Sequence, residues 1–330
     1  MNLQEYQRRT EQAHDHAGAR SPVPVQGCQL AAAAGTVAAA IAREQHGLLT
    51  ETGYRDALSD GLADLLHRAV ALASAVGLDL GEIAASGLAT LDDFDAACTP
   101  GTRTALPVFD AGYPEAERFP RRLAVTFQEA TDPRGRRVVT ATVTSMQPPA
   151  DAPRAGAGPR PLQTGDRLGD PLSDNAHRPD GYRFHDAIHL GFLTVLGWSP
   201  NLRALLHRKR KSVPIVDECE DGARAIFAEE GLAAVLARLA ETRIGFRRYH
   251  AVTRDVVDVA RTVTTGLEVC QAPGWLWRQA IWQGFQAMDQ LITHRGGVLV
   301  ADLDARTLTF QPVSASQQPW PDMQSSPAAA

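Results

Sequence analysis

The apolar residues of this chain follow two different periods, and the change between them divides the sequence. In the first 91 residues they recur with the period of a helix, as in the stripe that contains Leu58, Leu62 and Leu65. Farther along, residues 123–127 and 138–144 alternate with the period of two that is typical of strands. A segment rich in Pro, Gly and Thr separates the two patterns. The chain is therefore predicted to have an all-α N-terminal helical domain and an α+β C-terminal domain.

The predicted boundaries follow from these patterns. We place the helical domain at 1–95, a connector at 96–120, the α+β domain at 121–312 and a disordered tail at 313–330. The first domain is expected to hold four helices, at 2–16, 26–45, 54–76 and 79–91. The second is expected to have a helical core with small β-hairpins. Its predicted elements are a hairpin from 123–127 and 138–144, helices at 182–197, 200–207, 217–241, 252–268 and 274–293, and a closing hairpin from 298–302 and 307–310.

Composition narrows the class of protein. The net charge of -5 offers no general attraction for nucleic acid. The four cysteines show neither metal-knuckle nor redox spacing, which is typical of reduced thiols. The polar N-terminus argues against a signal peptide, and the apolar run Leu30–Ala42 is too short to span a bilayer. We therefore expect a cytoplasmic protein with no membrane segment.

Three runs in the N-terminal part, 30–39, 58–66 and 75–83, carry a family resemblance. They are similar to the MazG-like, all-helical nucleoside triphosphate pyrophosphohydrolases. In that family Glu-x-x-Glu on one helix and Glu-x-x-Asp on a later helix hold Mg²⁺ against a triphosphate. The matching positions here are Ala33, Thr36, Gly61 and Asp64. The resemblance implies a four-helix fold and a homodimer that forms through these helices.

The chemistry of that family needs carboxylates that the chain lacks. Residues i and i+3 share one helix face, so two such pairs surround one metal ion. With Asp64 alone remaining, the first domain is predicted to have lost its metal site. We interpret it as a degenerate domain that acts as a scaffold, a dimerisation element or a nucleotide-binding relic.

The C-terminal part also carries a resemblance, to the extension that is fused to some MazG-like proteins. It covers about residues 106–310 and rests on four runs, at 169–175, 181–186, 196–200 and 208–212. This resemblance implies a relationship and no particular mechanism.

Two histidines and an aspartate in this part form the candidate catalytic group. His185 and His189 are spaced i, i+4, so on a helix they share a face that suits one metal ion. Asp186 follows His185 directly, as in phosphohydrolases with adjacent His and Asp, and the run is not the His-Glu-x-x-His motif of zinc proteases. The alternative is a helix N-terminus with satisfied polar side chains.

Acids farther along complete the predicted metal site. Glu218 and Asp221 are spaced i, i+3, and Glu229 lies three turns beyond Glu218 if 217–241 is one helix. These acids are the predicted metal ligands of the second domain, and Mg²⁺ or Mn²⁺ is the expected ion. The alternative is a solvated acidic helix face.

A basic run and a polar loop are the candidate substrate-binding groups. Arg208, Lys209 and Arg210 supply the positive charge that a triphosphate needs, and Asp174 and Asn175 precede the histidines. The alternatives for the run are a solvated surface or contact with nucleic acid, and the second of these lacks interleaved aromatic residues.

The function that these observations favour is that of a MazG-like nucleotide pyrophosphohydrolase-family protein. Its expected substrate is a nucleotide or a related phosphorylated small molecule, and any hydrolysis that the chain retains is expected at the His/Asp/Glu site of the second domain rather than in the first. One alternative is a non-catalytic nucleotide-sensing or dimerisation scaffold. Another is a nucleic-acid-processing protein that uses the basic run.

Overall fold

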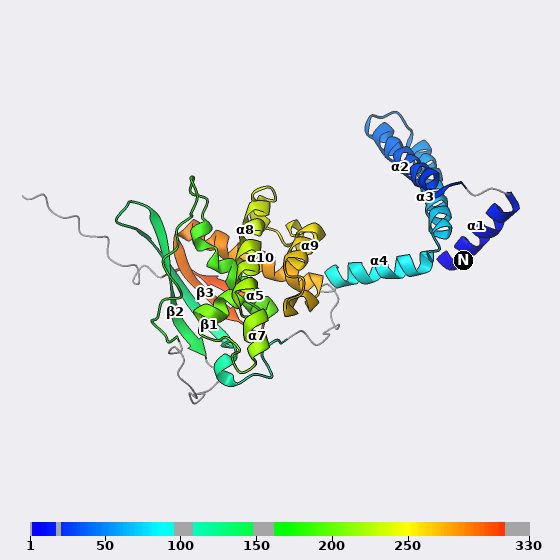
Figure 1. Ribbon diagram of the computed structural model, residues 1–330. Coiled ribbons are helices and arrows are strands. Elements are labelled where there is room, and N and C mark those ends of the chain that lie inside the picture. Colours follow the sequence, from blue (N-terminus) through cyan, green and yellow to red (C-terminus); the bar gives the residue numbers. More distant parts are fainter. Residues whose placement is uncertain (1, 18–20, 96–107, 148–161, 314–330) are drawn as a thin grey trace, which may run out of the picture. The chain divides into compact units, whose positions relative to one another are not determined.

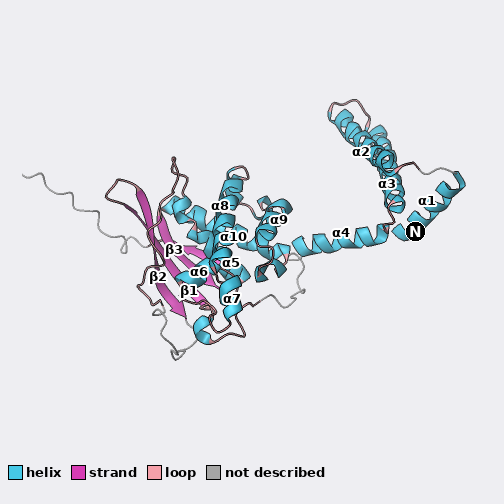
Figure 2. Cartoon of the chain, in the orientation of Figure 1, coloured by secondary structure: helices cyan, strands magenta, loops and turns pink. Residues whose placement is uncertain are grey.

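The structure is a computed structural model that describes residues 2–17, 21–95, 108–147 and 162–313. It divides into two units, Met1–Asp92 and Asp93–Ala330. Among the described residues, the first unit is helical and all strands belong to the second (Figure 2). The predicted fold class, an all-helical part followed by an α+β part, is thereby confirmed. The predicted disordered tail from residue 314 onward and most of the predicted connector lie outside the described residues.

Four helices form the first unit, as the helical period of its sequence predicts. They are α1 (Leu3–Ala17), α2 (Val23–Gln45), α3 (Glu51–Ala75) and α4 (Leu80–Asp95), the last of which runs past the unit boundary. The hydroxyl of Thr50 caps α3 by accepting a hydrogen bond from the backbone N–H of Gly53. Helices α2 and α3 pack along one another, and α1 packs against α3.

Three positions that the sequence analysis matched to metal ligands are packing or surface positions in this unit. Ala33 is buried, and a Cβ on the buried Gly61 would lie 3.0 Å from Cγ2 of Val37, so small residues allow α2 and α3 to approach closely. Asp64 is exposed on α3, and its Oδ1 lies 3.2 Å from Nε of Arg68. No ligand cluster forms around Asp64 among the described residues.

One described helix is long and apolar enough to cross a membrane by length and composition alone. It is α2, whose 23 residues extend the apolar run that the sequence analysis judged too short. Helices α3 and α4 pass the same test only together, with a bend of 109° between them.

The two predicted hairpins of the second unit form, and they join into one antiparallel sheet. β1 (Arg122–Thr131) pairs with β2 (Arg137–Gln147), and β3 (Gly296–Asp302) pairs with β4 (Thr307–Gln311). β1 also pairs with β3, which gives the strand order β2-β1-β3-β4. The buried residues of β1 and β2 alternate with partly buried ones, as the period of two predicts.

Two helices pack on this sheet and on each other (Figure 1). They are α5 (Asp186–Leu196), in which every residue is buried, and α10 (Gly274–His294). Their backbones meet at two glycines, because a Cβ on Gly191 would lie 2.7 Å from Cα of Gly284. A third helix, α8 (Ala223–Glu241), packs against α5 and brings acidic residues to it.

Shorter elements complete the second unit. The α-helices are α6 (Pro200–Leu205), α7 (Pro214–Cys219) and α9 (Arg254–Val263), and the 3-10 helices are η2 (Glu115–Glu117), η3 (Tyr182–Phe184), η4 (Ile244–Phe246), η5 (Tyr249–Ala251) and η6 (Glu268–Gln271).

The prediction of one helix over 217–241 is wrong, because α7 and α8 are separate helices. The chain turns at Asp221 and Gly222 between them. A Cβ on Gly222 would lie 1.9 Å from the carbonyl oxygen of Glu218, so only glycine fits this turn. The predicted helix at 252–268 is also shorter, since α9 ends at Val263.

Candidate metal centre

Two histidines and one glutamate converge on one point in the second unit. His185 precedes α5, His189 lies one turn into it, and Glu230 comes from α8. Their ligand atoms all lie within 4.8 Å of one another. Nε2 of His185 is 3.6 Å from Oε2 of Glu230, and Nε2 of His189 is 3.5 Å from Oε1. The i, i+4 spacing places both rings on one face of the helix, as the sequence predicts.

The opposite nitrogen of each ring is held by a hydrogen-bond acceptor. Nδ1 of His185 lies 2.9 Å from the carbonyl oxygen of Tyr182, and Nδ1 of His189 lies 2.9 Å from Oε1 of Glu229. A carbonyl and a carboxylate can only accept, so each Nδ1 carries a proton, and in a neutral ring Nε2 keeps its lone pair. In that neutral state both lone pairs are available to a ligand near Glu230.

Glu229 is fully buried and held in place by three donors. Besides His189, its carboxylate accepts hydrogen bonds from the hydroxyl of Ser199 at 2.6 Å and from the backbone N–H of Asn201 at 2.8 Å. The side-chain amide of Asn201 donates to Oε1 of Glu230. The N-terminus of α6 thus orients both glutamates.

The charges of these groups depend on one another. Burial raises the pKa of Glu230, but the rings of His185 and His189 outweigh burial and hold it well below its usual range. Burial lowers the pKa of His189, but the carboxylates of Glu229 and Glu230 outweigh burial and raise it to about 10. Burial raises the pKa of Asp186, which lies beside the histidines. The point between the three ligand atoms therefore favours a positive charge.

One atom of the cluster is unsatisfied within the described residues. Nε2 of His189 is fully buried and has no hydrogen-bond partner. Its distance of 3.5 Å to Glu230 exceeds the usual range of about 2.7–3.2 Å for such a bond. Buried polar atoms rarely stay without a partner, so this nitrogen fits a ligand from outside the chain.

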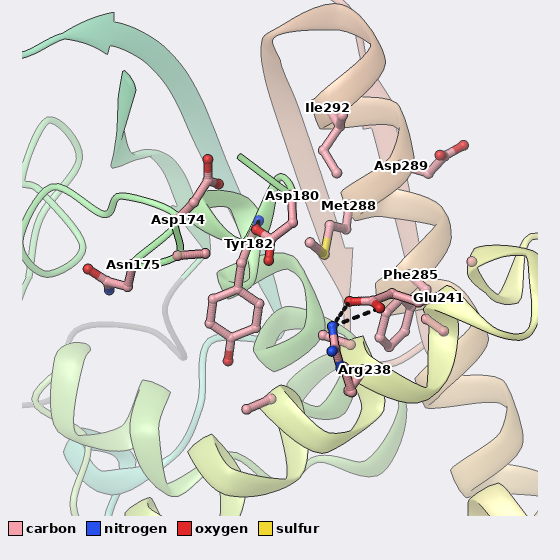
Figure 3. A pocket seen from close by; sticks show the side chains of 15 residues that line it. Asp174, Asn175, Asp180, Tyr182, Arg238, Glu241, Phe285, Met288, Asp289 and Ile292 are labelled. Carbon is pink, nitrogen blue, oxygen red and sulfur yellow. Dashed lines mark hydrogen bonds and ion pairs between the residues drawn. The ribbon is translucent and has the colours of Figure 1, made fainter. Parts of the chain in front are cut away.

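A pocket of about 460 Å³ lies among residues of α8, α10 and the loop before α5 (Figure 3), and none of the three cluster residues lines it. Its apolar wall is formed by Phe285, Met288 and Ile292 of α10 and by alanines of α8. Its charged lining consists of Asp174, Asp180, Glu241, Asp289 and Arg238. Arg238 donates to both carboxylate oxygens of Glu241, at 2.7 and 2.8 Å (Figure 3).

Tyr182 connects the pocket with the cluster. Its side chain belongs to the pocket lining, and its ring stacks on that of His185 with centroids 4.3 Å apart and planes inclined by 2°. Burial, supported by the charge of Glu230, raises the pKa of Tyr182 to about 12, so the phenol stays neutral. On α8, Glu230 lies one turn before the pocket residue Ala234, so one helix face serves both features.

The comparison with protein families identifies this part of the chain. Residues 159–314 match the family model of the MazG C-terminal domain. This part of the second unit is similar to the MazG C-terminal domain. The predicted relationship to the extension of MazG-like proteins is thereby confirmed, over a shorter range than expected. No curated protein and no solved structure matches the chain.

The second unit brings four of the predicted site residues together. His185 and His189 supply candidate ligand atoms, Asp186 lies between them at the start of α5, and Glu229 orients His189. The third candidate ligand, Glu230, was not predicted. Neighbouring residues of a helix point about 100° apart, so only one of two adjacent glutamates can face Nε2, and the sequence does not tell which one.

The other predicted metal ligands lie apart from the cluster. Glu218 is exposed on α7, and Asp221 is buried in the turn before α8. Oδ1 of Asp221 pairs with Nη2 of Arg210 at 2.7 Å. Since α7 and α8 are separate helices, the expected common face of these acids does not exist.

The arginine side chains of the basic run contact other residues of the second unit. Arg210 is fully buried between Asp221 and Glu268, which outweigh burial and raise its pKa above the usual range. Arg208 is buried and donates to the backbone carbonyls of Glu115 and Ala116.

Lys209 is partly exposed, and its Nζ lies 3.5 Å from Oδ1 of Asp217. Of the predicted substrate-binding residues, only Asp174 and Asn175 line the pocket. Asp174 also accepts hydrogen bonds from the guanidinium group of Arg183, at 2.9 Å.

Proposed function

We propose that this chain is a metal-dependent nucleotide pyrophosphohydrolase whose chemistry takes place in its MazG C-terminal domain. The observation that carries the proposal is the convergence of His185, His189 and Glu230 beside a pocket that shares Tyr182 with them. The family match favours a nucleotide as substrate.

The proposed reaction converts a nucleoside triphosphate and water into a nucleoside monophosphate and pyrophosphate. The water oxygen bonds to the α-phosphorus, the bond from that phosphorus to the bridging oxygen breaks, and pyrophosphate leaves with the electron pair. The proton of the attacking water passes to solvent. A bound metal ion would lower the pKa of that water and polarise the phosphate.

The residues of the chain have distinct roles in this proposal. His185, His189 and Glu230 would hold the ion, while Glu229 and the carbonyl of Tyr182 keep each Nδ1 protonated. The apolar wall of the pocket would receive the nucleobase. Carboxylates of the lining suit ribose hydroxyls better than phosphates, so the phosphates are expected to point toward the metal.

The first unit is proposed to form a homodimer rather than a second active site. Large apolar side chains are exposed along its helices, among them Leu62 and Leu66 on α3 and Leu88 on α4. A second copy that covers these side chains would remove apolar surface from water. The same observation favours the second candidate function, a dimerisation scaffold whose pocket senses a nucleotide without hydrolysing it.

Use of the basic run for nucleic acid has less support. Such binding requires Lys and Arg side chains that reach phosphates, and Arg208 and Arg210 are buried among protein partners. Lys211 is exposed, but one exposed cation is too little positive charge for a nucleic-acid-binding surface.

The experiment is pyrophosphate release from a panel of nucleoside triphosphates with Mg²⁺, Mn²⁺ or Zn²⁺. We expect release by the wild type and loss of release in His185→Ala and Glu230→Gln. Glu218→Gln is the control, because it removes an exposed carboxylate on α7. Asp64→Asn tests the first unit. Loss of release in Asp64→Asn alone would overturn the proposal, and no release from any triphosphate would favour the sensing scaffold.

A further inference from the structure

The element types of the three ligand atoms in the candidate metal centre favour some metal ions over others. Two are imidazole nitrogens and one is a carboxylate oxygen. Imidazole suits zinc, iron, nickel and copper, whereas Mg²⁺ prefers oxygen ligands only. The donor set therefore differs from the all-carboxylate set of the MazG-like helical enzymes that the N-terminal part resembles.

The contacts from the histidines to Glu230 leave room for an ion between them. With bonds of about 2.05 Å, two ligands of a tetrahedral zinc ion lie about 3.3 Å apart. Adjacent ligands of an octahedral Mg²⁺ ion lie closer, at about 2.9 Å. The distances from the histidine nitrogens to Glu230, 3.6 Å to Oε2 and 3.5 Å to Oε1, are nearer to the tetrahedral value, and the three ligand atoms lie within 4.8 Å of one another.

The surrounding contacts prepare the ligands for a metal ion. A carboxylate that holds the far nitrogen of a ligand histidine, as Glu229 does for His189, orients the ring and strengthens it as a donor. With both rings neutral, three electron pairs would face one another, and a metal ion would supply the positive charge between them. A proton on His189 is the other way to supply that positive charge, so the test must separate a metal site from an ion pair.

The centre is also accessible from one side. The side chain of His189 is fully buried and that of His185 is 9% exposed, whereas the side chain of Glu230 is 38% exposed. An ion can therefore enter past Glu230. Three protein ligands leave at least one coordination position for water or substrate, which is typical of catalytic zinc.

We propose that His185, His189 and Glu230 bind a zinc-class transition-metal ion in preference to Mg²⁺. This proposal differs from the expected cofactor, Mg²⁺ or Mn²⁺, because it favours an ion that prefers nitrogen ligands. The use of the ion for hydrolysis rests on the proposed function, but its binding does not.

Metal binding itself is the test. The untagged full-length chain is alkylated first, because Cys28, Cys219 and Cys270 are exposed thiols that also bind zinc. It is then stripped with a chelator and titrated with Zn²⁺ against a chromogenic chelator. We expect one Zn²⁺ per chain, no displacement by millimolar Mg²⁺, and visible absorption of a four- or five-coordinate ion after loading with Co²⁺.

Variants locate the ion. Glu230→Gln and His185→Gln should each weaken Zn²⁺ binding by at least about 100-fold, since each removes a ligand. Glu218→Gln should bind like the wild type. Circular dichroism of each variant verifies folding. If His185→Gln does not fold, Glu230→Gln still tests the proposal.

Three outcomes would overturn the inference: a folded wild type without stoichiometric Zn²⁺, ligand variants that both bind Zn²⁺ as tightly as the wild type, or displacement of Zn²⁺ by Mg²⁺. The first outcome would leave only an ion pair between His189 and Glu230. Zinc bound at this centre without pyrophosphate release would refute the proposed function and leave the metal site standing.

Discussion

Glu229 and His189 are joined by a hydrogen bond of 2.9 Å in a fully buried environment, 40 positions apart in the sequence. The bond fixes the proton on Nδ1 and turns Nε2 toward Glu230. The adjacent glutamates of α8 therefore face opposite nitrogens of the same ring. Glu229 positions the ring, and Glu230 is proposed to bind the same metal ion as the ring.

The positioning role of Glu229 predicts a graded effect. Glu229→Gln should weaken Zn²⁺ binding by about 10–100-fold, because an amide is a poorer acceptor for the Nδ1 proton while all three ligands remain. The measurement is the chelator competition described above, with Glu241→Gln on the same helix as control. Unchanged affinity in a folded Glu229→Gln protein would contradict the role.

The contact between α5 and α10 predicts a steric effect on stability. Gly191→Ala should lower the free energy of unfolding by about 1–3 kcal/mol, because its Cβ would lie 2.7 Å from Cα of Gly284. Gly231→Ala on α8 is the matched control, since a Cβ there meets nothing within 4 Å, and it should be neutral or stabilising by up to about 1 kcal/mol.

Tryptophan fluorescence during denaturation reports on the second unit alone, because that unit holds all five tryptophans of the chain, Trp198, Trp275, Trp277, Trp282 and Trp320. Equal denaturation midpoints for Gly191→Ala and Gly231→Ala would contradict this prediction. They would show that α5 and α10 can move apart without loss of stability.

The basic run predicts a stability defect rather than a binding defect. Arg210→Met should destabilise the second unit by about 3–5 kcal/mol, because the buried Asp221 would lose its ion pair at 2.7 Å and keep only the more distant Arg203 at 3.6 Å. The double variant Arg210→Met with Asp221→Leu should recover part of this loss. Lys211→Gln, which changes an exposed side chain, is the control. The same fluorescence measurement applies, and a stable Arg210→Met that has only lost nucleotide affinity would favour a phosphate-binding role.

The proposed dimer predicts a change in mass. Leu62→Glu with Leu66→Glu should convert the chain from dimer to monomer, because both side chains are exposed on one face of α3 and charges there resist burial. Light scattering after size exclusion measures the mass. Asp56→Glu, an exposed and conservative change on the same helix, is the control. A monomeric wild type would contradict the dimer directly.

Local patterns in the sequence predict the elements well and their long-range partners poorly. The helical period locates α1 to α4, and the period of two locates all four strands. No local pattern, however, reveals that β1 pairs with β3, because Phe127 and its partner Gly297 are far apart in the chain. The break at Gly222 was also missed, since helix propensity on both sides outweighs one glycine in a sequence pattern.

The candidate site was predicted in part for a similar reason. Spacing on one helix places His185 and His189 on a shared face, but the third ligand comes from another helix, and its identity depends on how α8 is rotated. Arg208 and Arg210 look like surface residues because charged side chains rarely lie inside proteins without a partner. Their partners, the carbonyl of Ala116 for one and Asp221 for the other, are defined only by the tertiary fold.

The pairing of β1 with β3 determines where this part of the chain can be cut. The family match begins at residue 159, after both strands of the first hairpin. A fragment that starts there would lack the strand that completes the hydrogen bonding of β3, and Leu299 would lose cover on an edge open to other chains. A recombinant piece must therefore begin before Asp110, whose carboxylate accepts a hydrogen bond from the backbone N–H of the buried Phe119, and such a piece is longer than the family segment.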